Sequence, residues 1–223
     1  MIKTMSSDST KMKILLAAHR VFIRKGMDGA RMQEIADEAG INKALLHYYF
    51  HSKDQLFNEV FYGILSQMIP RLVVIFSGDG PFLDKVEAIV TEYDTYLSRN
   101  PILPQFIFRE INRDPEQLSR FMSDQGLDFD RIQERINKEV SLGRIRPITF
   151  QHLFANLIGM IVMPYIGRPL FQLKLFKGDA ERYDTFLLER RAVISQFIRQ
   201  ALDRKSTRLN SSHITRSRMP SSA

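Results

Sequence analysis

The sequence contains no cysteine and no tryptophan. Without cysteine there are no disulfides, no thiolate nucleophiles and no zinc or iron–sulfur sites built on cysteine ligands, and the chain suits a reducing compartment. Hydrophobic residues account for 44% and charged residues for 26% of the 223 positions. This composition is typical of a soluble globular protein and excludes a disordered or fibrous chain.

Long hydrophobic runs are also absent. The longest apolar stretch, residues 157–166, is about half of the ~20 residues that span a membrane, and it contains Pro164. Residues 1–11 are polar and lack the apolar core of about 7–15 residues found in signal peptides. We therefore expect a cytoplasmic protein without a membrane partner.

Excess positive charge is scarce outside the carboxyl-terminal segment. The formal net charge is +7, but residues 204–223 hold five basic and no acidic residues, so the rest of the chain carries only +2. The high isoelectric point is therefore weak evidence for a nucleic-acid partner. This serine-rich segment has no strong apolar face and cannot repay the entropy of ordering, so we expect a disordered tail. Two interpretations stay open: non-native read-through sequence, which we prefer, and a basic arm that binds DNA phosphates.

Apolar residues recur mostly at every third or fourth position, and no stretch alternates with a period of two between hairpin turns. This pattern predicts an all-α protein. Breaks in the helical pattern fall at 26–29, 40, 78–81, 100–101, 114–115, 143–147, 167–169 and 178–179, and leave about nine helices. Because the first pieces are short and the later ones long, we predict an amino-terminal module at 10–53 and a larger helical body at 54–203.

The first three predicted helices form a small module. Residues 11–25 place apolar side chains on one side before Gly26, and a second helix follows until Gly40 supplies a left-handed cap. Asn42 can accept hydrogen bonds from the free amides of a third helix. The inward side chains of that helix are Leu46, Tyr49 and Phe50, and the outward ones are Lys43, Ala44, His47 and Tyr48. Its outer face can enter a DNA major groove about 12 Å wide, but the same spacing also suits a plain packing helix.

The residue identities are more specific than the spacing. The segment IADEAGINKALLHYYFHSKDQLF, residues 35–57, follows Ile14, Phe22 and Gly26 in order and without gaps. Together they resemble the amino-terminal helix-turn-helix domain of TetR/AcrR-type transcriptional regulators, over about residues 10–60. The resemblance implies that the chain binds double-stranded DNA. It places the DNA contacts on Asn42, Lys43, Ala44, Leu45, His47, Tyr48 and Lys53.

Each of these positions has a plausible chemistry. Lys43 can reach a guanine edge or a phosphate, Ala44 admits close approach, and Leu45 can touch a thymine methyl. The side chains of His47 and Tyr48 can donate to phosphates. Ser52 and Gln55 form a capping-box pattern beside Lys53, which favours a phosphate seat at that helix end, although Ser52 also suits a plain cap.

The sequence departs from the family pattern at the start of the second helix. The family usually has threonine or serine at the positions of Ala30 and Arg31, where a hydroxyl caps this helix. We therefore expect no side-chain cap there, and we expect Arg31 to contact a phosphate through its charge instead. Because the outward residues also differ from the common ones, the base preference of a relative does not transfer to this chain.

The body, residues 54–203, is rich in phenylalanine and methionine, whose side chains fill cores and also line adaptable ligand cavities. We predict a pocket for a small apolar ligand. The residues chosen to line it, or to orient the ligand, are Tyr93, Tyr96, Phe106, Arg109, Phe121, Phe129, Asn156, Met160 and Met163. Most such apolar side chains can equally be core, and Arg109 beside Glu110 can equally be a structural ion pair.

Two long helices predicted near the end, about 150–166 and 182–202, resemble the pair that forms the dimeric four-helix bundle of this family. The resemblance implies a homodimer whose two-fold axis sets the spacing of two DNA half-sites. We therefore predict a ligand-responsive repressor that leaves its operator when an apolar effector binds. The alternative is a dimeric effector-binding module without sequence-specific DNA binding.

Catalytic and metal sites are not expected. His47 and His51 have the four-residue spacing of zinc ligands, but they lie at a helix end with no third ligand nearby. The sequence has no serine nucleophile elbow, phosphate loop or dinucleotide fingerprint. We therefore predict neither an enzyme nor a bound metal or cofactor.

Overall fold

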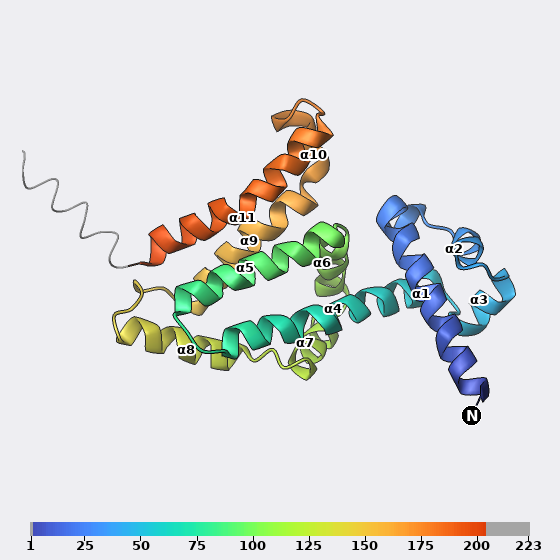
Figure 1. Cartoon of the computed structure of the whole chain (residues 1–223), viewed down its shortest axis with the longest axis horizontal. Helices are drawn as coiled ribbons and strands as arrows, with labels where there is room; N and C mark the ends of the chain where they lie inside the picture. The colour runs from blue at the N-terminus through green and yellow to red at the C-terminus, as the bar shows by residue number, and fades with distance from the viewer. Residues whose placement is uncertain (1, 204–223) are drawn as a thin grey trace, which may run out of the picture. The chain divides into compact units, whose positions relative to one another are not determined.

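The structure is a computed structural model that describes residues 2–203 (Figure 1). The predicted tail at 204–223 lies outside these residues. Within the described range the chain is helical, and the one β-type contact is an isolated bridge between Ile145 and Asp203. The all-α prediction is therefore confirmed.

Eleven helices follow one another along residues 2–203, rather than about nine. They are α1 (Ile2–Gly29), α2 (Met32–Ala39), α3 (Lys43–Tyr49), α4 (Lys53–Ser77), α5 (Phe82–Arg99), α6 (Leu103–Arg113), α7 (Pro115–Asp124), α8 (Phe129–Ser141), α9 (Phe150–Ile166), α10 (Arg168–Leu175) and α11 (Ala180–Leu202). The count of nine omits the helix end at 50–52, which only the Ser52 capping pattern predicted, and the break at 125–128, because both carry little glycine or proline. Residues 50–52 contain neither, and residues 125–128 contain only Gly126.

The chain divides into two compact units. The first comprises the residues up to Arg71 and Thr95–Gly126, and the second comprises Leu72–Asp94 and the residues from Leu127 onward. In the first unit α1 packs on α2 and α2 on α3, while α6 packs on α7. The predicted domain boundary at residue 53 stays a prediction.

An aromatic cluster forms the core of the first unit. The Phe22 ring of α1 meets Phe57 of α4 edge-on at 4.8 Å, and Phe57 lies 4.5 Å from Phe61. The Phe61 ring stacks on Phe106 of α6 at 5.2 Å. Because all four side chains are at most 4% exposed, this cluster fixes α1, α4 and α6 together.

By length and composition alone α4 is apolar enough to cross a membrane, and α9 with α10 would qualify only as a pair bent by 75°. Seven apolar side chains of α4, between Leu56 and Ile69, are buried in the core. This face of α4 therefore contributes to the core.

Polar contacts tie the helices of the second unit. The buried Asp94 carboxylate of α5 accepts hydrogen bonds from the Tyr165 hydroxyl of α9 at 2.8 Å and from Arg191 Nε of α11 at 2.6 Å. Burial, followed by the hydrogen bond to Asp94, raises the pKa of Tyr165 above its ordinary value. The Asp94 carboxylate thus joins three helices that are far apart in sequence.

Helix α9 continues through a proline because its neighbour compensates. Pro164 has no N–H, so it cannot bond the Met160 carbonyl one turn earlier. Arg190 Nη2 of α11 donates to that Met160 carbonyl at 2.9 Å, and the Tyr183 hydroxyl donates to the Pro164 carbonyl at 2.6 Å. The predicted helix 150–166 is confirmed, while α11 begins at Ala180, earlier than predicted, because Asp179 caps it.

Candidate nucleic-acid interface

Two glycines shape the first three helices, which we call the head. Gly26 has φ +67°, a kink in α1 at the position where the sequence predicted the helix to end. Gly40 also has φ +67° and ends α2 in the left-handed conformation, as predicted. A residue with a β-carbon is strained in this region, so these glycines allow two sharp changes of direction.

Helix α3 is held by its inner side and by its amino-terminal cap. The Asn42 side-chain oxygen accepts a hydrogen bond from the Leu45 amide at 2.7 Å, which confirms the predicted cap. Leu46 is fully buried and Phe50 is 1% exposed, whereas Tyr49 is only half-buried. These anchors fix the rotation of α3 about its axis.

The opposite side of α3 is open. Lys43, Ala44 and Tyr48 are exposed, with Tyr48 at 75%, while Leu45 and His47 are half-buried. The Tyr48 ring meets the Tyr49 ring edge-on at 5.4 Å, which orients it outward from the half-buried tyrosine. The side chains predicted to face outward thus gather on one face of a short helix.

Helix α2 begins without a side-chain cap. Arg31 occupies the N-cap position in extended conformation and makes no capping hydrogen bond, which confirms the expectation from the missing hydroxyl. Its side chain is exposed. The free amides of the first turn and the Arg31 guanidinium therefore leave this end of α2 electropositive.

Ion pairs between α1 and α2 were missed by the sequence analysis. Arg20 and Arg24 bond Glu38 at 2.8 and 2.9 Å, and Lys25 bonds Glu34 at 2.9 Å. The hydrogen bonds from Arg24 and then Arg20 lower the pKa of Glu38 below its ordinary value. The sequence did carry a signal for these pairs. Arg20 and Arg24 are four residues apart, as are Glu34 and Glu38, so each pair lies on one side of its helix.

These ion pairs change the charge balance of the head. The carboxylates of Glu34 and Glu38 are neutralised by α1, whereas Arg31 and Lys43 have no acidic partner among residues 2–203. The segment 31–53 has three basic and three acidic residues, and after this pairing it presents the positive charges of Arg31 and Lys43 at the starts of α2 and α3, while Asp37 lies near the end of α2.

The start of α4 is capped as predicted, with one difference. The Ser52 hydroxyl accepts from the Gln55 amide at 3.1 Å, but the Gln55 side chain accepts from the His51 amide at 3.0 Å rather than from that of Ser52. Lys53 Nζ donates to the carbonyls of Asp28 and Ala30, at 3.3 and 3.1 Å. Two of its three donors are therefore engaged within the head, and one remains for an anion.

The nine residues predicted to line a ligand pocket are divided between the two compact units, and their ligand role stays a prediction. Tyr96, Phe106, Arg109 and Phe121 belong to the first unit, and the other five belong to the second. Phe106 is buried in the aromatic core, and Tyr93 is 8% exposed, with burial raising its pKa to about 12. Asn156 and Met163 are exposed on α9.

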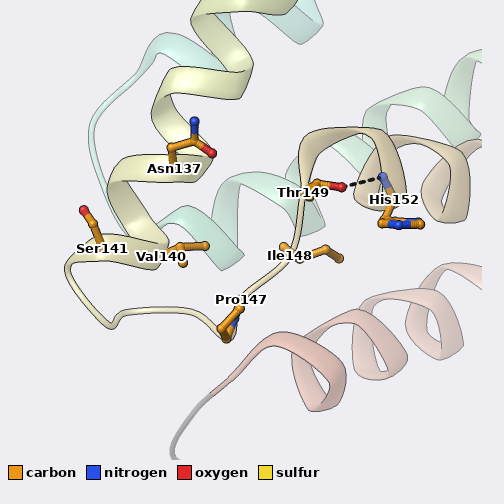
Figure 2. Close-up of a pocket in the computed structure, with 7 residues that line it drawn as sticks. All are labelled: Asn137, Val140, Ser141, Pro147, Ile148, Thr149 and His152. Carbon is orange, nitrogen blue, oxygen red and sulfur yellow. Dashed lines mark hydrogen bonds between the residues drawn. The ribbon is translucent and has the colours of Figure 1, made fainter.

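An open depression of about 530 Å³ lies in the second unit (Figure 2). It is formed by the end of α8, the following loop and the first turn of α9, where the Thr149 hydroxyl caps the helix by accepting from the His152 amide at 3.4 Å. Its lining residues are Asn137, Val140, Ser141, Pro147, Ile148, Thr149 and His152. None of the nine predicted residues is among them.

Metal chemistry has no geometric support in the described part of the chain. No three histidine, aspartate or glutamate side chains of residues 2–203 lie close enough to hold one ion. His19 is a hydrogen-bonded polar residue, with Nε2 2.7 Å from the Asn100 side-chain oxygen.

The head coincides with a known sequence family. Residues 14–60 match the model of the bacterial regulatory proteins of the tetR family. The chain is 26% identical over 179 residues to a probable HTH-type transcriptional regulator, YttP, of Bacillus subtilis, covering 78% of this chain and 86% of that protein. It is 30% identical over 95 residues to the HTH-type transcriptional repressor NicS of Pseudomonas putida, covering 41% of this chain and 45% of that protein.

Solved structures share the fold. A transcriptional regulator of the TetR/AcrR family from Thermobifida fusca superposes with a TM-score of 0.60 at 20% identity, covering 83% of this chain and 96% of the other. HlyIIR, a hemolysin II transcriptional regulator, gives a TM-score of 0.54 at 22% identity, covering 76% of this chain and 94% of the other. The likeness therefore extends from the head to the larger helical body.

Proposed function

We propose that this chain, a member of the TetR family of bacterial DNA-binding transcriptional regulators, is a homodimeric, cytoplasmic repressor that a small apolar effector releases from its operator. The observation that carries the proposal is the outward face of α3. A short helix whose inner side is buried and whose outer side is free can enter the major groove without unfolding the head.

The roles proposed for the α3 residues follow from their exposure. Lys43, the first residue of the helix, reaches a guanine edge or a phosphate, and Ala44 lets the backbone approach the bases. Leu45 presents its half-exposed side chain to a thymine methyl. His47 and Tyr48 donate to phosphates on the outer side.

Three further residues position the head on the DNA backbone. The Asn42 side-chain oxygen is occupied by the cap, so its amide N–H₂ is the group offered to a phosphate. Arg31 at the uncapped start of α2 forms a second phosphate contact. Lys53 supplies its remaining donor at the start of α4.

The proposed dimer uses α9 and α11, which pack against each other in the second unit (Figure 1). Five large apolar side chains of these two helices are 40–67% exposed. They are Phe154 and Met163 on α9, and Leu188, Val193 and Phe197 on α11. A second copy of the pair would bury this surface in a four-helix bundle. The two-fold axis would then set two heads on successive half-sites of the operator.

The effector is proposed to be apolar because the body is rich in phenylalanine and methionine. Of the nine candidate residues, Tyr93, Phe129 and Met160 belong to the second unit and are not strongly exposed. The effector releases the DNA only to the extent that it binds the released conformation more tightly, and a coupling of ~1–3 kcal/mol is ordinary.

The DNA-binding proposal is tested with the DNA upstream of the protein's own gene, by fluorescence anisotropy at several salt concentrations. Lys43→Ala should weaken binding and reduce the slope of log affinity against log salt by about 1. Lys174→Ala, which removes an exposed lysine of α10 in the second unit, is the matched control and should change neither. A folded dimer that ignores duplex DNA would contradict the proposal and favour an effector-binding module.

The dimer is tested by sedimentation. Phe197→Glu places a charge on the exposed apolar face of α11 and should shift the protein from dimer to monomer. Lys138→Glu changes an exposed side chain of α8 and should leave the dimer intact. A dimer that tolerates the Phe197 change would exclude this face as the interface.

A further inference from the structure

The side chain of Arg109, on α6, connects that helix to the head. Its Nη2 donates to the Asn58 side-chain oxygen at 2.6 Å, and its Nη1 lies 3.3 Å from Asp54 Oδ1. Nη1 also contacts the sulfur of Met27, just beyond the kink in α1. The guanidinium lies 4.7 Å from the centre of the Phe57 ring. One side chain of α6 therefore touches both the end of α1 and the first turns of α4.

The next residue anchors α6 further along α4. Glu110 is fully buried, accepts a hydrogen bond from the Tyr62 hydroxyl at 3.2 Å, and pairs with Arg113 at 2.6 Å. Burial, followed by the charge of Glu110, raises the pKa of Tyr62, so the hydroxyl stays neutral and keeps donating. Breaking this contact would leave the buried carboxylate with the charged groups of Arg113 and Arg109 as its remaining partners.

The contacts on α4 form a regular set. Asp54, Asn58 and Tyr62 are four residues apart, so they share one side of the helix, and all three bind Arg109 or Glu110. We call them the α4 ladder. Its first member, Asp54, immediately follows Lys53, whose ammonium holds the Asp28 and Ala30 carbonyls of the α1–α2 connection. The α4 ladder thus meets α6 where the head is attached.

We propose that Arg109 is the positioning residue that fixes the head on α6. The inference rests on the proposed repressor function and replaces the predicted ligand role of Arg109. A planar guanidinium can bond Asp54 and Asn58 while stacking on Phe57, and a lysine ammonium cannot make this combination.

The first test compares Arg109→Ala and Arg109→Lys with Arg120→Ala, which removes an exposed arginine of α7 that pairs only with Glu116. Arg109→Ala should weaken operator binding about tenfold, with an unchanged salt slope because Arg109 touches no phosphate. Arg109→Lys should restore part of the affinity. Arg120→Ala should match the parent. A reduced salt slope, or parental affinity of folded Arg109→Ala, would overturn the proposal.

The second test needs no DNA. Because the chain has no cysteine, spin labels can be placed at Gln33→Cys in α2 and Gln105→Cys in α6, both exposed positions of the first unit. Labelled chains are diluted with unlabelled ones, and the distance distribution is measured by pulsed electron resonance. Arg109→Ala should broaden the distribution, while Arg120→Ala should not.

The two tests separate the inference from the proposed function. An unchanged label distribution in Arg109→Ala overturns the positioning role even if the protein binds its operator. If the parent fails to bind duplex DNA, the repressor proposal fails, and a broadened distribution still supports Arg109 as the residue that holds the head.

Discussion

Replacement by alanine should affect stability at one of two adjacent leucines of α3 and DNA binding at the other. Leu46 is fully buried, whereas Leu45 is half-buried on the side proposed to face DNA. Leu46→Ala removes three buried carbons, worth ~0.8 kcal/mol each in transfer free energy. The residual cavity adds to this, so we expect a loss of about 3 kcal/mol. Leu45→Ala should cost less than about 1 kcal/mol.

Amide hydrogen exchange measures the loss of stability of the two variants separately for each helix. A loss of about 3 kcal/mol should speed exchange of the α2 and α3 amides on the order of 100-fold. The second unit has its own core, so its amides should keep parental protection in Leu46→Ala. Leu45→Ala should keep parental protection throughout and weaken operator binding.

The result that would refute this reasoning is equally specific. If Leu45→Ala loosened α3 while Leu46→Ala left its protection unchanged, the helix would be rotated about its axis. The outward face proposed for DNA would then be the buried one.

Three further outcomes follow from other contacts. Asn42→Ala removes the α3 cap and should lower the free energy of unfolding by about 1 kcal/mol in thermal or urea unfolding, and parental stability would show the cap to be dispensable. The pKa of Glu38 is lower in the folded head than its ordinary value of 4.5, so the ionised carboxylate stabilises the head at pH values above 4.5. This stability is lost as the pH falls through the folded pKa. Glu38→Gln should therefore weaken the fall of the melting temperature at acid pH. Arg190→Ala leaves the Met160 carbonyl without its donor and should cost ~1–3 kcal/mol, whereas an unchanged melting temperature would mean that α9 tolerates Pro164 unaided.

Much of the head could be predicted because its signals are local. The left-handed glycines, the Asn42 cap and the buried Leu46 each depend on residues within a few positions of one another. The bounds of α9 were predicted for the same reason, since periodicity and capping are short-range properties.

The effector site stays a prediction because its signals are not local. Apolar side chains such as Phe106 look alike in a core and in a cavity, and only packing decides between the two. Arg109 had two interpretations, and the ion pair with neighbouring Glu110 is present at 3.4 Å. Its other partners, Asn58, Asp54 and Met27, lie 51 to 82 positions away in the sequence. No local pattern encodes such a distant partner.

The sequence by itself determined an all-α chain, its main helix ends and the family of its first sixty residues, because periodicity, caps and a dense local motif are written in neighbouring positions. Only the tertiary structure decided that Glu38 is neutralised by α1, that Arg109 of α6 contacts the head and that Arg190 completes α9. Each of these depends on which distant groups burial brings within hydrogen-bond distance, and that choice is made by the packing of whole helices.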